Sequence, residues 1–173
     1  MFRLTRRQFS IGGAIATVAV IGCHSAESDW ETLSNAQART LAALCDQIIP
    51  ADECAGASQA GAVNYIDRQL ARHYQMHQDT YREGLDAVDG NSRRRFGSTF
   101  ADATPDQQYQ ATLAIEKDHR AFFDLVRQHT MEGYYGSPRH GGNRDAASWR
   151  MLGLDEPPLR GRAHYDLRKG SAT

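Results

Sequence analysis

The sequence predicts an all-α fold: a compact single-domain helical bundle with a long, irregular glycine-rich loop near its C-terminal end. Three observations support this prediction. Apolar residues recur at helical spacing in several segments, capping residues, prolines or glycines bound those segments, and no stretch of useful length alternates apolar and polar residues. The 173 residues, less a leader, suit one domain with one core.

The N-terminal half of the bundle contains three helical patterns. Ser34 belongs to the residue types that cap helices and precedes a helix over 34–49, which Pro50 ends. A second helix is expected over 57–77, and a third near 81–88 should break at Gly90-Asn91, before a short turn over 93–100. The expected core stripes are Leu41, Leu44, Cys45 and Ile48, then Val63, Ile66, Leu70, Tyr74 and His77, then Tyr81, Leu85 and Val88.

The C-terminal half begins with a strong start signal, Thr104 as a cap followed by Pro105 at the first helical position. From there to about residue 135 the pattern predicts one long helix or a pair. Asp145 is expected to cap a last helix through Trp149 and Leu152. The core candidates of the long pattern are Leu113, Phe122, Phe123, Leu125 and Val126.

The first 22 residues have the features of an export signal. Arg6 and Arg7, with the hydrophobic Phe9 two positions further on, match a twin-arginine signal. The uncharged run 11–22 would span about 18 Å as a helix, well short of the roughly 30 Å hydrocarbon core, so it fits a signal peptide better than a membrane span. The alternative is a chance pair of arginines before a buried helix.

The signal ends at Cys23, in a setting similar to a bacterial lipoprotein cleavage site. Cleavage before Cys23 would free its thiol to take a diacylglycerol, and several acyl chains give stable anchoring. The alternative is cleavage by an ordinary signal peptidase, for instance after Ala26, which would leave a soluble protein. We therefore expect a signal peptide (1–22), a tether (23–33), a helical domain (34–154) and an extended tail (155–173), held by lipid on the periplasmic side of a bacterial membrane.

Charge argues against nucleic-acid binding. The formal net charge is −1, and because residues 1–22 carry three arginines and no acid, the rest of the chain has 17 basic against 21 acidic residues, a net charge of −4. The trio Arg93-Arg94-Arg95 is the one basic cluster, and cations at a solvated helix end complement the helix dipole.

Cys45 and Cys54 are the two cysteines left once Cys23 takes lipid. In an oxidising periplasm they can form a disulfide, and closing a loop of about ten residues would contribute roughly 2–3 kcal/mol. The alternative is that Cys45 is a small buried hydrophobic residue and Cys54 an exposed thiol.

Motifs for chemistry are mostly missing from the sequence. No dinucleotide-binding glycine fingerprint is present, so we expect no cofactor in this chain. Glu116 and His119 match one half of a di-iron bundle motif without a second copy. His73 and His77 stand one helical turn apart and could hold a metal. The remaining candidate, an acid–base cluster, would combine His140 with Arg139, Arg144 and Asp145.

The loop over 133–145 contains four glycines in its first ten residues. Glycine loses more backbone entropy on folding than other residues, so this number of glycines indicates a special backbone path. It could be a plain connector, but Tyr134, Tyr135, Arg144 and Trp149 are of types enriched where interfaces concentrate binding energy. Tyr134 and Trp149 could also pack the loop onto the helices, so that other residues meet a partner.

Two segments carry a family resemblance. Residues 138–145 (PRHGGNRD), followed by Trp149 and Gly153, and residues 44–52 (LCDQIIPAD), followed by Gly-Ala and Ala-Gly pairs, resemble the gluconate 2-dehydrogenase subunit 3 family. These are small, non-catalytic subunits of bacterial membrane-bound flavoprotein dehydrogenases that act on sugars and sugar acids. His140 stands where the family usually has an aromatic residue.

The resemblance implies a large FAD-containing partner of the glucose–methanol–choline type, with a haem c protein, a cytochrome c, as electron acceptor. The small subunit would carry the folded partner through twin-arginine export, support its folding and anchor it. The alternatives are a free-standing lipoprotein whose metal or catalytic site uses His73, His77, His119 or His140, and a structural lipoprotein without a redox partner. The expected partner interface consists of Tyr134, Tyr135, Pro138, His140, Gly141, Gly142, Asn143, Arg144 and Trp149.

Overall fold

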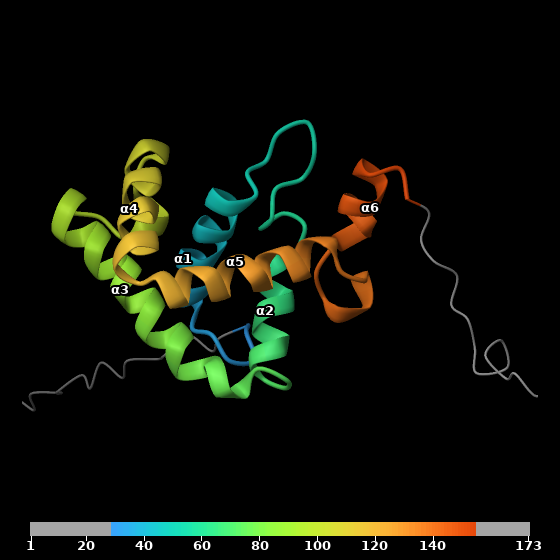
Figure 1. Ribbon diagram of the computed structural model, residues 1–173, viewed down its shortest axis with the longest axis horizontal. Helices are drawn as coiled ribbons and strands as arrows, with labels where there is room; N and C mark the ends of the chain where they lie inside the picture. The colour runs from blue at the N-terminus through green and yellow to red at the C-terminus, as the bar shows by residue number, and fades with distance from the viewer. Residues whose placement is uncertain (1–28, 155–173) are drawn as a thin grey trace, which may run out of the picture.

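The computed structural model describes residues 29–154, and within this range it consists of helices, turns and loops without a strand, which confirms the all-α prediction (Figure 1). Short 3-10 turns lie between several of the helices. The helices are α1 (Asn35–Ile48), α2 (Ala62–Leu70), α3 (Gln78–Phe96), α4 (Pro105–Asp118), α5 (Arg120–Tyr135) and α6 (Ala147–Met151), and the turns are η1 (Gln75–His77), η2 (Phe100–Asp102), η3 (Pro138–His140) and η4 (Arg144–Ala146).

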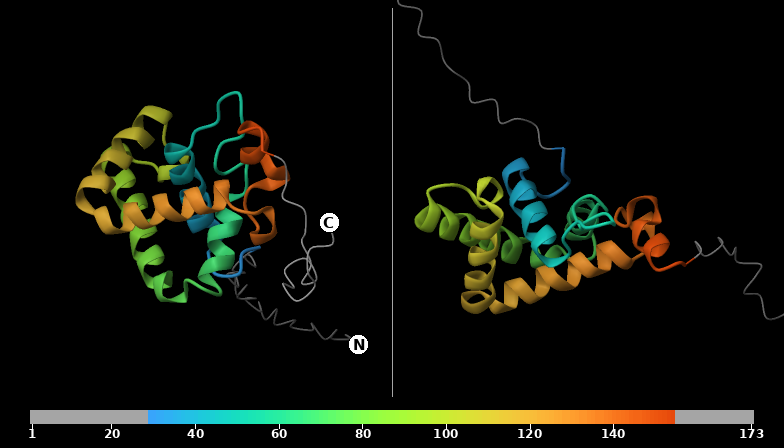
Figure 2. Two further views of the ribbon diagram at one scale, coloured as in Figure 1. Left: turned by 45° about the vertical axis from the view of Figure 1, so that its right-hand side comes forward. Right: turned by 90° about the horizontal axis from the view of Figure 1, so that it is seen from above.

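Helix α5 runs across the bundle and connects its two ends (Figures 1 and 2). It contacts α1 and α2 along its length, α3 and α4 towards its start, and α6 beyond its end. Most of the predicted core residues are buried, but Leu113 is 43% exposed, so its assignment to the core was wrong. The largest fully buried side chains are Tyr81, Tyr134, Phe100, Leu41, Leu44, Ile66, Leu70, Leu85, Ile115, His129, Val88 and Val126.

Two predicted helix starts are confirmed in atomic detail. The Ser34 hydroxyl accepts a hydrogen bond from the Gln37 amide, and the Gln37 side-chain oxygen accepts one from the Ser34 amide. Thr104 and Gln107 repeat this reciprocal arrangement at α4, with Pro105 in the first turn. Each pair satisfies two backbone groups that a bare helix end would leave open.

The helix α3 is longer than the sequence suggested, because it continues through Gly90-Asn91 to Phe96. A glycine inside a helix weakens it without ending it. The helix stops at Gly97, whose φ of +79° is the left-handed conformation that ends many helices. The arginine trio occupies the last turn, as expected.

The second predicted helix is instead shorter and begins late. Residues 57–61 form turns that lead to Gly61 (φ +82°), α2 covers only Ala62–Leu70, and the chain turns again before η1. The long C-terminal pattern is a pair of helices, because His119 leaves the helical conformation (φ −129°, ψ 47°) between α4 and α5.

The folded domain begins before Ser34. The backbone amides of Glu31, Thr32 and Leu33 donate to the Asp67 carboxylate at 2.7, 2.9 and 3.0 Å, and Leu33 is buried. The carboxylate itself is almost fully buried at the end of α2. Residues 31–33, which we assigned to the tether, are therefore fixed to the bundle; the export signal (Arg6, Arg7, Phe9) and Cys23 lie outside the described residues.

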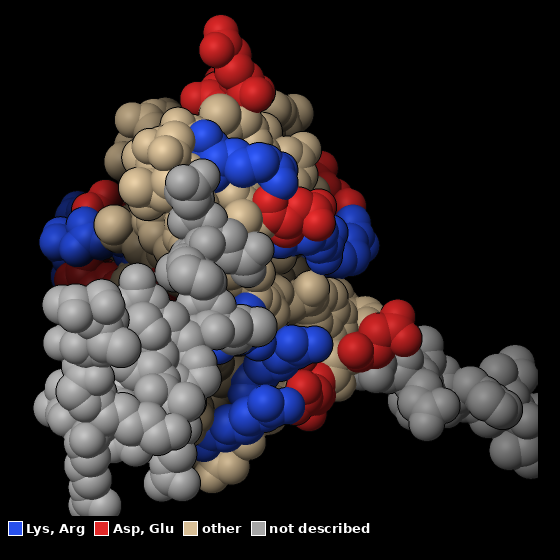
Figure 3. All heavy atoms as spheres, turned by 90° about the vertical axis from the view of Figure 1, so that its right-hand side faces the viewer, with Lys and Arg blue, Asp and Glu red and all other residues tan. Residues whose placement is uncertain are grey.

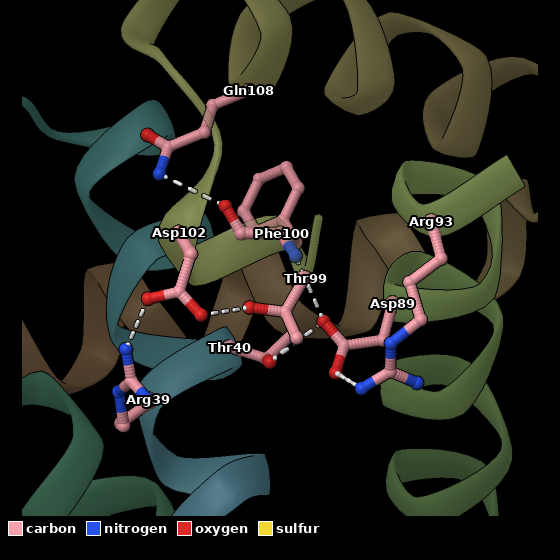
Figure 4. A network of polar contacts seen from close by, with 8 residues as sticks. All are labelled: Arg39, Thr40, Asp89, Arg93, Thr99, Phe100, Asp102 and Gln108. Carbon is pink, nitrogen blue, oxygen red and sulfur yellow. Dashed lines mark hydrogen bonds and ion pairs between the residues drawn. The ribbon is translucent and has the colours of Figure 1, made fainter. Parts of the chain in front are cut away.

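A polar network joins α1, α3 and η2 at the opposite end of α5 from α6 (Figure 4). The Asp89 carboxylate accepts hydrogen bonds from the Thr40 hydroxyl and the Phe100 amide, both at 3.0 Å. Nearby, Asp102 pairs with Arg39 on the surface. One half-buried acceptor thus fixes the loop after α3 against α1.

The expected disulfide is not formed: Cys45 and Cys54 are both free thiols. Cys45 lies on the inner face of α1, with its Sγ 3.2 Å from the Thr130 hydroxyl of α5, whereas Cys54 belongs to the loop that leaves α1. Burial raises the pKa of the Cys45 thiol to about 12. The alternative interpretation holds for Cys45, which is buried, whereas Cys54, expected to be an exposed thiol, is half-buried.

Candidate partner interface

The glycine-rich loop after α5 is organised by one buried side chain, Asn143. Its Nδ2 donates to the Gly136 carbonyl at 2.8 Å, and its Oδ1 accepts from the Ser148 amide at 2.9 Å. The second bond supplies an acceptor to the first turn of α6, the role that we predicted for Asp145. Asp145 does not cap α6, because its own backbone is left-handed and its side chain points to no helix amide.

The loop lies close against the rest of the bundle at Gly142. A Cβ atom added there would sit 2.1 Å from the Gly133 carbonyl oxygen, so no side chain fits. The Arg144 amide donates to the Ala60 carbonyl at 2.8 Å, which ties the loop to the segment before α2. The cluster of glycines in the sequence therefore serves the close approach of two backbones.

Three non-glycine residues in and beside η4 adopt positive φ: Asn143 (+43°), Asp145 (+55°) and Ala146 (+52°). For ordinary L-residues this conformation costs about 1–2 kcal/mol each. A connector between two helices does not need such a path. The conformation is retained because the buried contacts of Asn143 and Gly142 fix it.

Two aromatic residues anchor the loop from inside. Tyr134 is buried, and its hydroxyl donates to the Ala55 carbonyl at 2.8 Å. The Trp149 Nε1 donates to the Tyr135 carbonyl at 2.9 Å, which ties α6 to the end of α5. The alternative that Tyr134 and Trp149 pack the loop onto the helices is therefore confirmed.

Several large apolar side chains are exposed at the end of α5 and around α6. Tyr135 is 41% exposed and Met151, Leu152 and Leu154 are 42%, 54% and 55% exposed. Met131, one turn before Tyr135 in α5, is 48% exposed. We call these five residues the apolar face. Scattered exposed apolar residues are common on proteins, but their concentration at one end of a molecule is typical of an interaction site.

The predicted interface residues divide into two groups. Tyr134, Gly142 and Asn143 are buried, so as surface contacts these three assignments were wrong; they support the loop. The second group reaches the surface or is half-buried: Tyr135, Pro138, His140, Gly141, Arg144 and Trp149. Sequence reasoning missed Met131, Met151, Leu152 and Leu154; the apolar residues that follow the last helical pattern were the available signal.

The histidines expected in the alternative interpretation are not brought together. Within residues 29–154 no group of three or more His, Cys, Asp or Glu side chains is placed to hold a metal ion. His73 lies in the turn after α2 and His77 in η1, so the one-turn spacing on a single helix is lost. His119 caps the end of α4, and Glu116 pairs with Arg120 instead.

A polar aromatic cluster that the sequence did not reveal lies between α2, η1 and α5. The hydroxyls of Tyr65 and Tyr74 donate to the Glu132 carboxylate at 3.1 and 2.9 Å, and Tyr74 stacks on His129 with centroids 4.3 Å apart. Burial alone would raise the pKa of Glu132, but hydrogen bonds from Gln128, Tyr74 and Tyr65 outweigh it and lower that pKa.

His129 is held in its neutral form at the centre of this cluster. Its Nδ1 lies 2.9 Å from the Tyr81 hydroxyl. Burial lowers the pKa of His129, against the attraction of the Glu132 carboxylate. With tyrosines on both sides and no nucleophile beside it, His129 stabilises packing between α3 and α5.

Charge on the α6 side of the molecule is mixed. Figure 3 shows several groups of Lys and Arg side chains on this face, with acidic side chains between them. Such a surface favours a protein partner of matched charge pattern over a polyanion. Among residues 29–154, no helix has both the length and the apolar character required to span a bilayer.

Comparison with known proteins adds a family. Comparison with curated proteins and with solved structures gives no match. Residues 35–155 match the model of the family described as gluconate 2-dehydrogenase subunit 3, and this range covers α1 to α6 with the glycine-rich loop. The bundle and its loop therefore form one family unit, and the chain belongs to the gluconate 2-dehydrogenase subunit 3 family.

Proposed function

We propose that the chain is the non-catalytic small subunit of a periplasmic FAD-dependent dehydrogenase that oxidises a sugar, a sugar acid or a glycoside. The observation that carries this proposal is the apolar face, which the end of α5 and the region of α6 expose on either side of a loop whose conformation is fixed from inside. Family membership supports a dehydrogenase subunit as the partner that covers it. The catalytic subunit, of the glucose–methanol–choline type, holds the FAD and passes electrons to a cytochrome c.

The export signal gives the subunit a second role in this proposal. Arg6 and Arg7 direct the chain to the twin-arginine route, which carries folded proteins, and the flavoprotein without its own signal travels bound to it. Lipid on Cys23 then holds the complex at the membrane. The small subunit also supports folding of the flavoprotein by covering apolar surface on it.

The test replaces the signal arginines while leaving the domain intact. In the Arg6→Lys, Arg7→Lys variant, we expect the flavoprotein and its dehydrogenase activity to remain in the cytoplasmic fraction together with the small subunit. In the Cys23→Ser variant, both proteins should reach the periplasm but leave the membrane fraction. Export of the flavoprotein at its normal level despite the lysine variant would contradict the role.

A further inference from the structure

A groove of about 400 Å³ opens where α1, the start of α2 and the glycine-rich loop meet. Its lining residues include the apolar Ala38, Ala42 and Val63, which we call its floor, together with Trp30 and Arg144. Arg144 belongs to η4, the turn that directly precedes α6, so the groove reaches the same end of the chain as the apolar face. Its size is within the range of sites that hold short segments or small ligands.

The groove has a positive rim. Its ten lining residues include two arginines and no aspartate or glutamate. Arg39 already pairs with Asp102 at 2.5 Å (Figure 4). The exposed Arg144 guanidinium, by contrast, has no ion pair or side-chain hydrogen bond with any other residue of the described range 29–154.

The start of α2 adds to this potential. Gly61 provides no capping side chain, the first turn of the helix contains no acidic residue, and Gly61, Val63 and Asn64 all line the groove. The N-terminus of a helix carries a partial positive charge that favours a carboxylate nearby. The Arg144 amide donates to the Ala60 carbonyl, which fixes the backbone of this residue beside the groove. The guanidinium is not used in that contact and is available to pair with a carboxylate.

We propose that this groove docks a segment of the dehydrogenase catalytic subunit that carries an apolar side chain beside a carboxylate. The apolar side chain lies over Ala38, Ala42 and Val63, and the carboxylate pairs with Arg144 near the start of α2. The inference rests on the proposed function and specifies the chemistry of the partner surface. A basic segment would place a positive charge opposite Arg144, and a purely polar segment would leave the apolar floor uncovered. Charge complementarity therefore favours a segment that carries both an apolar side chain and a carboxylate.

The occupant can be identified by photo-crosslinking in the intact complex. A benzoylphenylalanine introduced in place of Asn35, an exposed residue that lines the groove, reports on the groove, and one in place of Leu152 reports on the apolar face. We expect the Asn35 probe to attach to an Asp- or Glu-containing segment of the flavoprotein, found by mass spectrometry. Attachment to residues 155–173 of the same chain, or to a second copy, would overturn the inference.

The same pair of probes separates the two proposals. If the Leu152 probe captures the flavoprotein and the Asn35 probe captures nothing, the groove inference fails and the accessory role stands. If neither captures it in a preparation whose chain is folded, the accessory role fails as well.

Charge reversal tests the carboxylate directly. With the full chain immobilised and the purified flavoprotein as the probe, we expect Arg144→Glu to slow association about tenfold at low salt, with the difference shrinking at high salt. Arg144→Lys should keep most of the rate, and Arg94→Glu, an exposed arginine in the last turn of α3, should change little. An equal effect of Arg94→Glu, or an effect of Arg144→Glu that salt does not change, would exclude a carboxylate at the groove.

Filling the groove is the complementary test. Ala42→Trp adds apolar volume on the floor without changing charge, and we expect it to weaken the complex about tenfold by steric exclusion. The thermal midpoint of each variant chain, measured alone, shows whether it has folded. Unchanged binding by a folded Ala42→Trp variant would show that no segment enters the groove.

Discussion

The two ends of α5 are held by different means. At the α3–α4 end, the Asp89 carboxylate joins helices of the core, and ordinary caps complete the chain turns. At the α6 end, the Asn143 amide holds a loop with three residues at positive φ. At the α3–α4 end the hydrogen bonds hold elements of the bundle together. At the α6 end the backbone of a loop outside the bundle is held in an unfavourable conformation. Conformational cost of this kind is usually retained for function.

The outer surfaces differ in the same sense. The α3–α4 end exposes one apolar pair, Tyr109 and Leu113 of α4, while the α6 end exposes the five residues of the apolar face. At the α6 end the Asn143 amide points inward and holds the loop, while five large apolar side chains are exposed among charged ones. Solubility alone would not favour such a concentration of exposed apolar residues.

The largest expected effect is on the stability of the loop. Gly142→Ala places a Cβ atom against a backbone carbonyl, and we expect a loss of about 3 kcal/mol in the free energy of unfolding, or local release of the loop, measured by denaturation and hydrogen exchange. The control at the other end is Gly97→Ala, where φ is +79° and no atom lies within 4 Å. It should cost about 1 kcal/mol. Equal costs would mean that the loop does not pack as described.

The second effect concerns binding without stability. Tyr135→Ser with Leu152→Ser should weaken the flavoprotein complex about 100-fold and lower the thermal midpoint of the chain only slightly, because Leu152 is exposed and Tyr135 gives up one edge contact with Tyr134. The matched control is Tyr109→Ser with Leu113→Ser at the other end. If the control pair weakens the complex as much, the apolar face is not the interface.

The third effect separates the two carboxylates of the α1–η2 network. Asp89→Ala leaves the Thr40 hydroxyl and the Phe100 amide without their acceptor, and we expect a loss of about 2 kcal/mol in unfolding free energy. Asp102→Ala removes a solvent-exposed pair with Arg39 and should cost much less. Chemical denaturation of the two variants measures the difference. Complex formation should be unaffected by Asp89→Ala in the folded protein.

The smallest effect is on the pH dependence of stability. Because burial lowers the pKa of His129 in the folded state, the unfolded chain takes up that proton first as pH falls below about 6.5. Stability from neutral His129 is therefore complete above that pH and decreases as pH falls towards the folded pKa. His129→Phe should flatten the stability profile in the acid range that begins at about pH 6.5. A profile that keeps its slope in this variant would place the titrating group elsewhere.

Local signals made much of the fold predictable. Ser34, Thr104 and Pro105 act on their own turns, so the starts of α1 and α4 follow from sequence. Gly90 was wrongly taken as the end of a helix, because packing of the rest of α3 keeps the helix intact through it. His119 is not a residue type that marks a helix end, so the exact position of the break between α4 and α5 could not be predicted.

The candidate interface stays a prediction, and the sequence indicated its loop as a region without separating the buried residues from the exposed ones. Glycines and aromatic residues mark the loop, but whether Tyr134 points inward depends on Ala55, 79 positions earlier in the chain. Asn143 looked like a surface residue because its two partners, Gly136 and Ser148, meet only once the loop has closed. The groove combines residues from three distant segments, so no single motif announces it.

The accessory role that we propose requires the apolar face of this chain to bind a flavoprotein. The most direct measurement is a pull-down of the tagged mature chain from its native membrane, with an absorption spectrum of the eluate. The account predicts a flavin spectrum and a co-purifying oxidoreductase polypeptide, both lost in the Tyr135→Ser, Leu152→Ser variant. A single colourless band from the unaltered chain would contradict it.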